Sequence, residues 1–172
     1  MFARIVAALT VTVALAASAP VLAAPAPKVS IASFTQLPTP LPYPYDAGQD
    51  ASAVVAAAEA RAKTEHKLLA IDLGGNWCPD CRILAGTIEL PELKAFVEAH
   101  YVFVSVDVGR FDKNGQIAGH YGLTGRLEGV PSLLIVDPQT DRLLDQGHTA
   151  ALSDARSMTP QALADWLAQW TP

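Results

Sequence analysis

The sequence predicts one α/β domain in which helices flank a central mixed β-sheet. From residue 50 onward, apolar segments typical of strands alternate with segments typical of helices, which indicates parallel strand pairs. The last two strand-like segments are separated only by a turn, as in an antiparallel hairpin. At 172 residues, the chain is long enough for one domain with a sizeable core and too short for two.

The first 23 residues have the pattern of a secretory signal peptide. Arg4 supplies a positive charge, residues 5–17 form an apolar run, and small residues before Ala24 offer a cleavage site. The apolar run is too short to span a bilayer comfortably. We therefore expect residues 1–23 to be removed and the protein to be periplasmic or secreted. The alternative is an uncleaved N-terminal anchor.

Residues 24–49 form a proline-rich lead-in to the domain. Because proline fixes φ and removes a backbone donor, we expect an extended segment. We interpret it as a plain linker, with a polyproline II ligand for another protein as the alternative. Residues 29–34 are a candidate edge strand, and Tyr43 and Tyr45 are candidate anchors on the domain. The prolines are Pro25, Pro27, Pro38, Pro40, Pro42 and Pro44.

The domain itself, residues 50–172, opens with a helix over residues 51–67 that Asp50 caps. Residues 68–73 form an apolar strand of the buried type, and two glycines from Gly74 end it. Three of the later helices begin with a proline, which suits the first helical position. The remaining elements are a helix from Pro79, a helix over 91–99, a strand over 101–108, a helix over 116–121, strands over 132–136 and 142–146, and a helix over 160–170.

Charge limits the classes of partner. The formal net charge is −5, and removal of residues 1–23 would take away only Arg4 and make it −6. A mildly acidic chain without a basic run has no electrostatic footprint for nucleic acid. The same absence disfavours a surface dedicated to anionic lipid.

The two cysteines lie in a Cys78-Pro79-Asp80-Cys81 motif between a strand and a helix. A disulfide across this spacing closes almost no loop, so it would stabilise the fold very little. At a helix start, however, the spacing puts both sulfurs on one face. Cys78 would meet free backbone N–H groups and the positive end of the helix dipole, which favour the nucleophilic thiolate. Cys78 is therefore the predicted attacking residue, and Cys81 resolves the mixed disulfide.

A metal site is the main alternative for this motif. Structural zinc normally needs four ligands, and the chain has no second pair of cysteines and only scattered histidines. Arg82 rather than histidine follows Cys81, so the c-type haem attachment pattern is absent. We expect no metal and no cofactor, although two soft thiolates could hold Cu(I).

Three features around the motif resemble the thioredoxin superfamily over approximately residues 50–170. Trp77 precedes the first cysteine, Asp72 lies six residues before it, and Val130-Pro131 stands just ahead of a strand. The resemblance implies the thioredoxin fold.

The resemblance also implies roles for these residues. Asp72 would accept a proton from Cys81, and burial would raise its pKa for that task. Trp77, Val130 and Pro131 would contact the substrate, with a cis peptide bond before Pro131. The alternatives are an Asp72 that only hydrogen-bonds nearby backbone and an ordinary trans proline at a strand start.

A narrower likeness concerns residues 87–93, where a second helix begins near a proline. This segment is loosely similar to the C-terminal domain of DsbD-type electron conduits, which act on the reducing side of the periplasm. Two departures from thioredoxins stand out. Phe103 occupies the position of a charged lysine, which would raise the proton affinity of Asp72 further. Residues 109–114 extend a loop, which we interpret as a solvated connection; shaping of substrate access is the alternative.

These observations predict a periplasmic thiol–disulfide oxidoreductase that exchanges with protein thiols and disulfides. Pro79 and Asp80 would tune its redox properties. The charge of Asp80 opposes a Cys78 thiolate, which favours a reductant, and Arg82 would partly offset it. A membrane electron donor of the DsbD type is a candidate partner. The alternatives are a thiol oxidase or isomerase, a copper-binding dithiol protein, and a partner-binding module with an idle disulfide.

Overall fold

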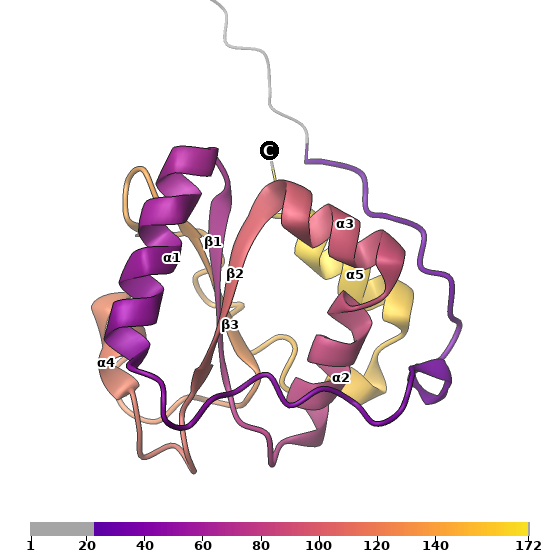
Figure 1. Ribbon diagram of the computed structural model, residues 1–172, viewed down its shortest axis with the longest axis horizontal. Helices are drawn as coiled ribbons and strands as arrows, with labels where there is room; N and C mark the ends of the chain where they lie inside the picture. The colour runs from indigo at the N-terminus through magenta and orange to yellow at the C-terminus, as the bar shows by residue number, and fades with distance from the viewer. Residues whose placement is uncertain (1–22, 172) are drawn as a thin grey trace, which may run out of the picture.

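The computed structural model describes residues 23–171 and has the predicted α/β architecture with a mixed sheet (Figure 1). The sheet has four strands in the order β2-β1-β3-β4. Its centre is β1 (Leu68–Gly74), which pairs in parallel with β2 (Tyr101–Asp107) and antiparallel with β3 (Ser132–Asp137). The edge strand β4 (Arg142–Leu143) pairs antiparallel with β3.

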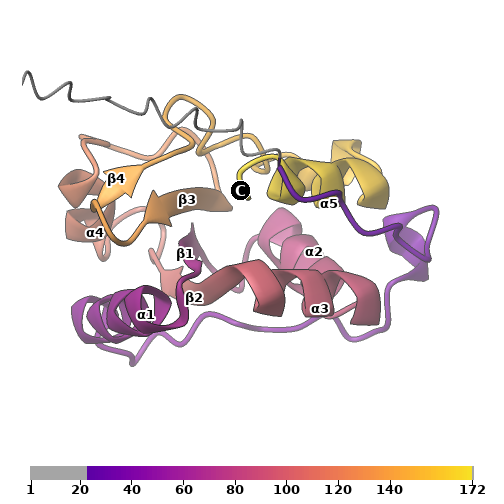
Figure 2. The same cartoon turned by 90° about the horizontal axis from the view of Figure 1, so that it is seen from above.

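Helices cover both faces of this sheet, and the two views in Figures 1 and 2 agree on their placement. One face carries two helices and the other three, so two apolar cores form, one on each side. The first face holds α1 (Ala51–Glu65) and α4 (Gly115–His120); the second holds α2 (Pro79–Ile88), α3 (Pro91–His100) and α5 (Pro160–Ala168). Two short 3-10 helices complete the described elements: η1 (Phe34–Gln36) and η2 (Ala155–Ser157).

The hairpin strand is shorter than predicted. It was expected over residues 142–146 but ends at Leu143. The side chain of Asp145 takes over as partner of β3, because its Oδ1 accepts the Ile135 N–H at 3.0 Å. A side-chain acceptor thus replaces a backbone carbonyl at this point of the ladder.

The lead-in is not a plain linker, so that interpretation is wrong. Residues 24–49 run along the outside of α3 and α5 and then past α2 to α1 (Figure 1). They bury three apolar side chains in the domain: Val29, Leu37 and Tyr45. The segment is a strap over the domain, and we call residues 24–49 the strap below.

The candidate edge strand over residues 29–34 is also wrong, because side chains take the backbone donors that a strand would use. The Val29 N–H binds Gln161 Oε1 at 2.9 Å, and the Ser30 N–H binds Glu92 Oε1 at 2.6 Å. At its start, the strap meets the other end of the chain, where the Ala24 N lies 3.1 Å from Thr171 Oγ1.

Residues 1–22, which hold nearly all of the predicted signal peptide, lie outside the described residues. Among residues 23–171, no helix has the length and apolar character that a membrane span requires.

Candidate active site

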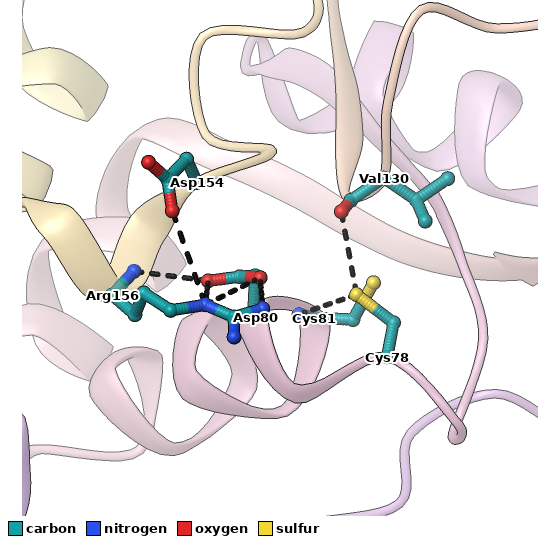
Figure 3. Close-up of polar contacts among 6 residues, drawn as sticks. All are labelled: Cys78, Asp80, Cys81, Val130, Asp154 and Arg156. Atoms are coloured by element: carbon teal, nitrogen blue, oxygen red, sulfur yellow. Dashed lines mark hydrogen bonds and ion pairs between the residues drawn. The ribbon is translucent and has the colours of Figure 1, made fainter.

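Cys78 is the N-cap of α2, and its sulfur takes the place of a capping oxygen. Its Sγ accepts the Cys81 backbone N–H at 3.2 Å and lies 3.3 Å from the Val130 carbonyl, to which the thiol donates (Figure 3). A hydrogen bond with the Cys81 side chain lowers the pKa of Cys78 to about 7, against the effect of burial. The helix start therefore favours the thiolate form of this sulfur.

Cys81 lies one turn into α2 and is completely buried. Both cysteines are free thiols in this structure. The hydrogen bond with Cys78 raises the pKa of Cys81, and burial raises it further. The two shifts have opposite directions, so Cys81 holds its proton more tightly than Cys78 does.

Asp72 lies in the middle of the sheet on β1 and is only 1% exposed. Its Oδ2 accepts two hydroxyl donors, Tyr45 Oη at 2.7 Å and Ser105 Oγ at 3.2 Å. Its Oδ1 has no hydrogen-bond partner among the described residues. Burial raises the pKa of Asp72 to about 7, although both hydroxyls act in the opposite direction. The carboxyl group can therefore gain or lose a proton near neutral pH.

The neighbour of Asp72 on β2 is Ser105, because the two residues are in register. Phe103 faces Ala70 instead and packs in the apolar core with α3 and α5. Phe103 stands where thioredoxins have a charged lysine. Asp72 instead has two uncharged hydrogen-bond donors, Ser105 and Tyr45. Tyr45 was expected only as an anchor of the lead-in.

Val130 and Pro131 stand beside the dithiol, and the peptide bond between them is cis. The Val130 carbonyl is the one that Cys78 contacts. The backbone before Pro131 therefore lies directly against the sulfur of Cys78.

Asp80 is buried and bound by Arg156, not offset by Arg82 as expected. Asp80 accepts the backbone N–H of Arg156 and a forked ion pair from its guanidinium (Figure 3). Arg82 instead donates to the carbonyls of Leu41 and Pro42 in the strap. The prediction that Arg82 offsets the charge of Asp80 is therefore wrong. Arg156, which is 76 residues away in the chain, pairs with Asp80 instead.

The loop of residues 109–114 contacts the active site. The Trp77 Nε1–H donates to the Gly109 carbonyl at 2.6 Å, and the Arg110 guanidinium lies 4.4 Å from the Trp77 ring centroid. Phe111 packs 5.9 Å from the same ring. The interpretation of this loop as a mere solvated connection is thus wrong, since it fixes the exposed Trp77 side chain.

Sequence reasoning missed Arg156 and Ser105, and it did not find the hydroxyl contact of Tyr45. The residue pattern around Arg156 gives no signal, because the pairing depends on how η2 packs on α2. Ser105 could have been found by aligning β1 with β2, since Asp72 and Ser105 are the fifth residues of their strands.

No group of three or more Cys, His, Asp or Glu side chains within residues 23–171 is placed to hold a metal ion.

Comparisons with known proteins agree with this geometry. A family model described as thioredoxin-like matches residues 50–138. A disulphide isomerase from Xylella fastidiosa Temecula1 is 32% identical, with a TM-score of 0.66, covering 74% of this chain and 96% of that chain. The oxidised C-terminal domain of DsbD from Neisseria meningitidis is 25% identical with a TM-score of 0.40, over 55% of this chain and 82% of that chain. The search of curated protein sequences found no match.

The fold and the dithiol site define a thiol–disulfide oxidoreductase. The chain belongs to the thioredoxin-like family.

Proposed function

We propose that this protein is a periplasmic thiol–disulfide oxidoreductase that reduces protein disulfides through Cys78 and Cys81. The observation that carries the proposal is the pairing of an N-capping sulfur on Cys78 with a fully buried thiol on Cys81. The Cys78 sulfur can attack a substrate disulfide, and the buried Cys81 sulfur can then attack Cys78 to resolve the mixed disulfide.

The reaction is a two-electron exchange. The Cys78 thiolate attacks one sulfur of a substrate disulfide and releases the other as a thiol. Cys81 then attacks the Cys78 sulfur, breaks the mixed disulfide and releases the second substrate thiol. The substrate disulfide gains two electrons, and the Cys78–Cys81 pair becomes a disulfide.

The direction of exchange follows from how well the Cys78 thiolate is stabilised. The hydrogen bond with Cys81 lowers its pKa only to about 7, which is nearer the value typical of thioredoxin than the roughly 3.5 of the strong oxidant DsbA. A less stabilised thiolate gives a less oxidising pair. We therefore expect a reduction potential between about −200 and −270 mV, near that of thioredoxin.

Proteins are the favoured substrate class because of the side chains around the dithiol. Among residues 23–171, the two exposed large hydrophobic side chains are Trp77 at 38% and Tyr43 at 63%. Trp77 precedes Cys78 in the chain, and Tyr43 stacks on the guanidinium of Arg82, the residue that follows Cys81. Exposed aromatic side chains that flank a reactive group are typical of protein-contact surfaces.

Isomerase activity is the second candidate, supported by the name of the 32% identical Xylella fastidiosa protein. A reductase must be re-reduced after each turnover, and we propose a membrane electron donor of the DsbD type for that step. An isomerase with the same dithiol would rearrange the disulfides of scrambled ribonuclease into the native pairing, with no net reduction and no external donor.

A trapping experiment tests the proposal. The full-length Cys81→Ser variant should accumulate mixed disulfides with periplasmic proteins, because the resolving thiol is gone. Cys78→Ser, the matched control, should accumulate few or none. N-terminal sequencing of the trapped protein should begin at Ala24, as expected for an exported and processed chain.

Two results would contradict the proposal. Equal trapping by both variants would mean that Cys78 is not the nucleophile. A trapped protein that starts at Met1 in the membrane fraction would contradict the periplasmic assignment.

A further inference from the structure

We propose that the hydroxyl group of Tyr45, contributed by the strap, carries the proton between Cys81 and Asp72 during resolution of the mixed disulfide. This inference rests on the proposed thiol–disulfide exchange and assigns one of its steps to a residue outside the region matched by the family model, which begins at residue 50.

Tyr45 is in the right place for this role. It is only 3% exposed, and its Oη donates to Asp72 Oδ2 at 2.7 Å. The Cys81 sulfur lies on the same side, because Tyr45 Oη and Cys81 Sγ both approach the α-carbon of Gly74. Tyr45 thus binds Asp72 and lies at Gly74 beside Cys81, between the two groups that exchange the proton.

Gly74 makes this arrangement possible. A Cβ at this position would lie 2.5 Å from Tyr45 Oη and 2.8 Å from Cys81 Sγ. Both polar atoms therefore pack against the bare α-carbon of Gly74, where any side chain would push them away. The glycine that ends β1 leaves room for the hydroxyl and the sulfur to meet.

The contacts of the strap fix the ring of Tyr45. Asn76 accepts the Tyr45 backbone N–H at 3.2 Å and returns a bond from its amide to the Tyr45 carbonyl at 2.7 Å. These two bonds tie the strap to the turn that leads into the Cys78 motif. The hydroxyl is consequently held at one place relative to Cys81.

The proposed step balances as follows. In the mixed disulfide, the Cys81 thiol gives its proton to Tyr45 Oη while Tyr45 gives its own hydroxyl proton to Asp72 Oδ2. Cys81 becomes the thiolate, Asp72 becomes the carboxylic acid and Tyr45 is unchanged. The thiolate then attacks the Cys78 sulfur and the substrate leaves as a thiolate. Burial and the neighbouring Asp72 charge raise the pKa of Tyr45, so its hydroxyl passes a proton on without remaining ionised.

The test compares two substitutions that each remove one hydroxyl from Asp72. Tyr45→Phe removes the donor that lies beside Cys81 at Gly74, and Ser105→Ala removes the other donor to Asp72. Reaction of the reduced protein with 5,5′-dithiobis(2-nitrobenzoate) releases one equivalent of dye on attack by Cys78 and a second on resolution by Cys81. Stopped-flow measurement of the second phase from pH 5 to 9 therefore reports resolution.

We expect both substitutions to move the midpoint of the pH profile upward, since each removes a bond that favours the ionised carboxyl. Only Tyr45→Phe should lower the plateau rate above that midpoint, by about tenfold or more, as for a lost acid–base group. Tyr101→Phe is the control for loss of a buried tyrosine hydroxyl, because Tyr101 Oη binds the Leu167 carbonyl away from the dithiol. It should leave the second phase unchanged.

A plateau rate for Tyr45→Phe equal to that of Ser105→Ala would overturn the inference. If Tyr45→Phe does not fold, the rate of the second phase of the wild-type protein, measured in mixtures of H₂O and D₂O, tests the relay instead. Two protons moving together give a curved dependence on deuterium fraction, and a linear one would overturn the relay. The dye reaction needs no protein substrate, so a wild-type protein with this profile that reduces no protein disulfide would contradict only the proposed function.

Discussion

At the scale of single residues, the buried carboxyl of Asp72 lowers the stability of the folded protein when it is ionised. Its carboxyl is buried with one oxygen unpartnered among the described residues, and burial raises its pKa from the usual 3.8 to about 7. A raised pKa means that the folded protein holds the proton more tightly than the unfolded chain does. Between about pH 4 and 7, the unfolded chain therefore ionises first, and the free energy of unfolding falls as the pH rises.

Asp72→Asn should remove this penalty. We expect the variant to be more stable than the wild type by about 1–3 kcal/mol at pH 8 and to approach the wild type at pH 4. Urea titrations at the two pH values measure the difference. The same variant should slow resolution by Cys81 more than attack by Cys78. Lower stability at pH 8 with unchanged resolution would identify Asp72 as a purely structural residue.

The sequence allowed prediction of the reactive residues but not of the groups around them. The positions of Cys78, Cys81 and Asp72 in the fold could be predicted because a short motif and a strand fix them, and the resemblance to thioredoxins supplied the role expected of Asp72. Tyr45 could not, because its place depends on the path of the strap, which Arg82 and Asn76 determine through backbone contacts. Long-range contacts of this kind leave no periodic pattern in a sequence.

At the scale of elements, the start of α2 is tied to η2 through Asp80 and Arg156. Asp80 is the second residue of the helix, where a negative charge favours the helix dipole. Its charge also raises the pKa of Cys78. Arg156 pairs with that carboxylate, so we expect the redox properties of the dithiol to depend on a contact with a different element.

Substitutions at this ion pair should move the reduction potential in opposite directions. Asp80→Asn removes the negative charge but can still accept the Arg156 N–H, so the Cys78 thiolate is better stabilised and the potential should rise. Arg156→Gln leaves Asp80 unneutralised, so the potential should fall. Shifts of about 30 mV would correspond to ~1.4 kcal/mol. Equilibration with glutathione, followed by Trp77 fluorescence, measures both values.

The pair itself also stabilises the protein. Because Asp80 is buried, either substitution should lower the free energy of unfolding, and the 56% exposure of the Arg156 side chain should keep that loss small. If the reduction potential moves in the same direction in Asp80→Asn and in Arg156→Gln, then altered folding, rather than charge at Cys78, determines the potential.

The element boundaries show where prediction from sequence fails. The first helix was expected to reach residue 67 but ends at Glu65, because His66 adopts a left-handed conformation. The final helix was expected to reach residue 170 but ends at Ala168. Prolines at the helix starts were reliable because a ring that fixes φ acts locally. Helix ends depend on neighbouring packing, so the same local reasoning misplaced them.

At the scale of the whole molecule, the alternation of strands and helices was enough to predict the mixed sheet and its helical layers. The strap was misread because proline content says that a segment is extended but not what it lies against. Its buried side chains, such as Leu37, come at irregular intervals. A composition that is typical of linkers therefore concealed a segment that covers α2 and supplies Tyr45.

The contact between Ala24 and Thr171 has a consequence for chain connectivity. Because the two ends of the described chain meet, a short glycine-serine bridge could join them and the chain could be opened elsewhere. The exposed turn around Thr140 is suitable, since it follows β3 at the end of the sheet opposite the dithiol. Such a circular permutant should fold and reduce insulin at a rate within about twofold of the wild type. Loss of folding on permutation would mean that the order of synthesis, and not only the final contacts, is needed to seat the strap.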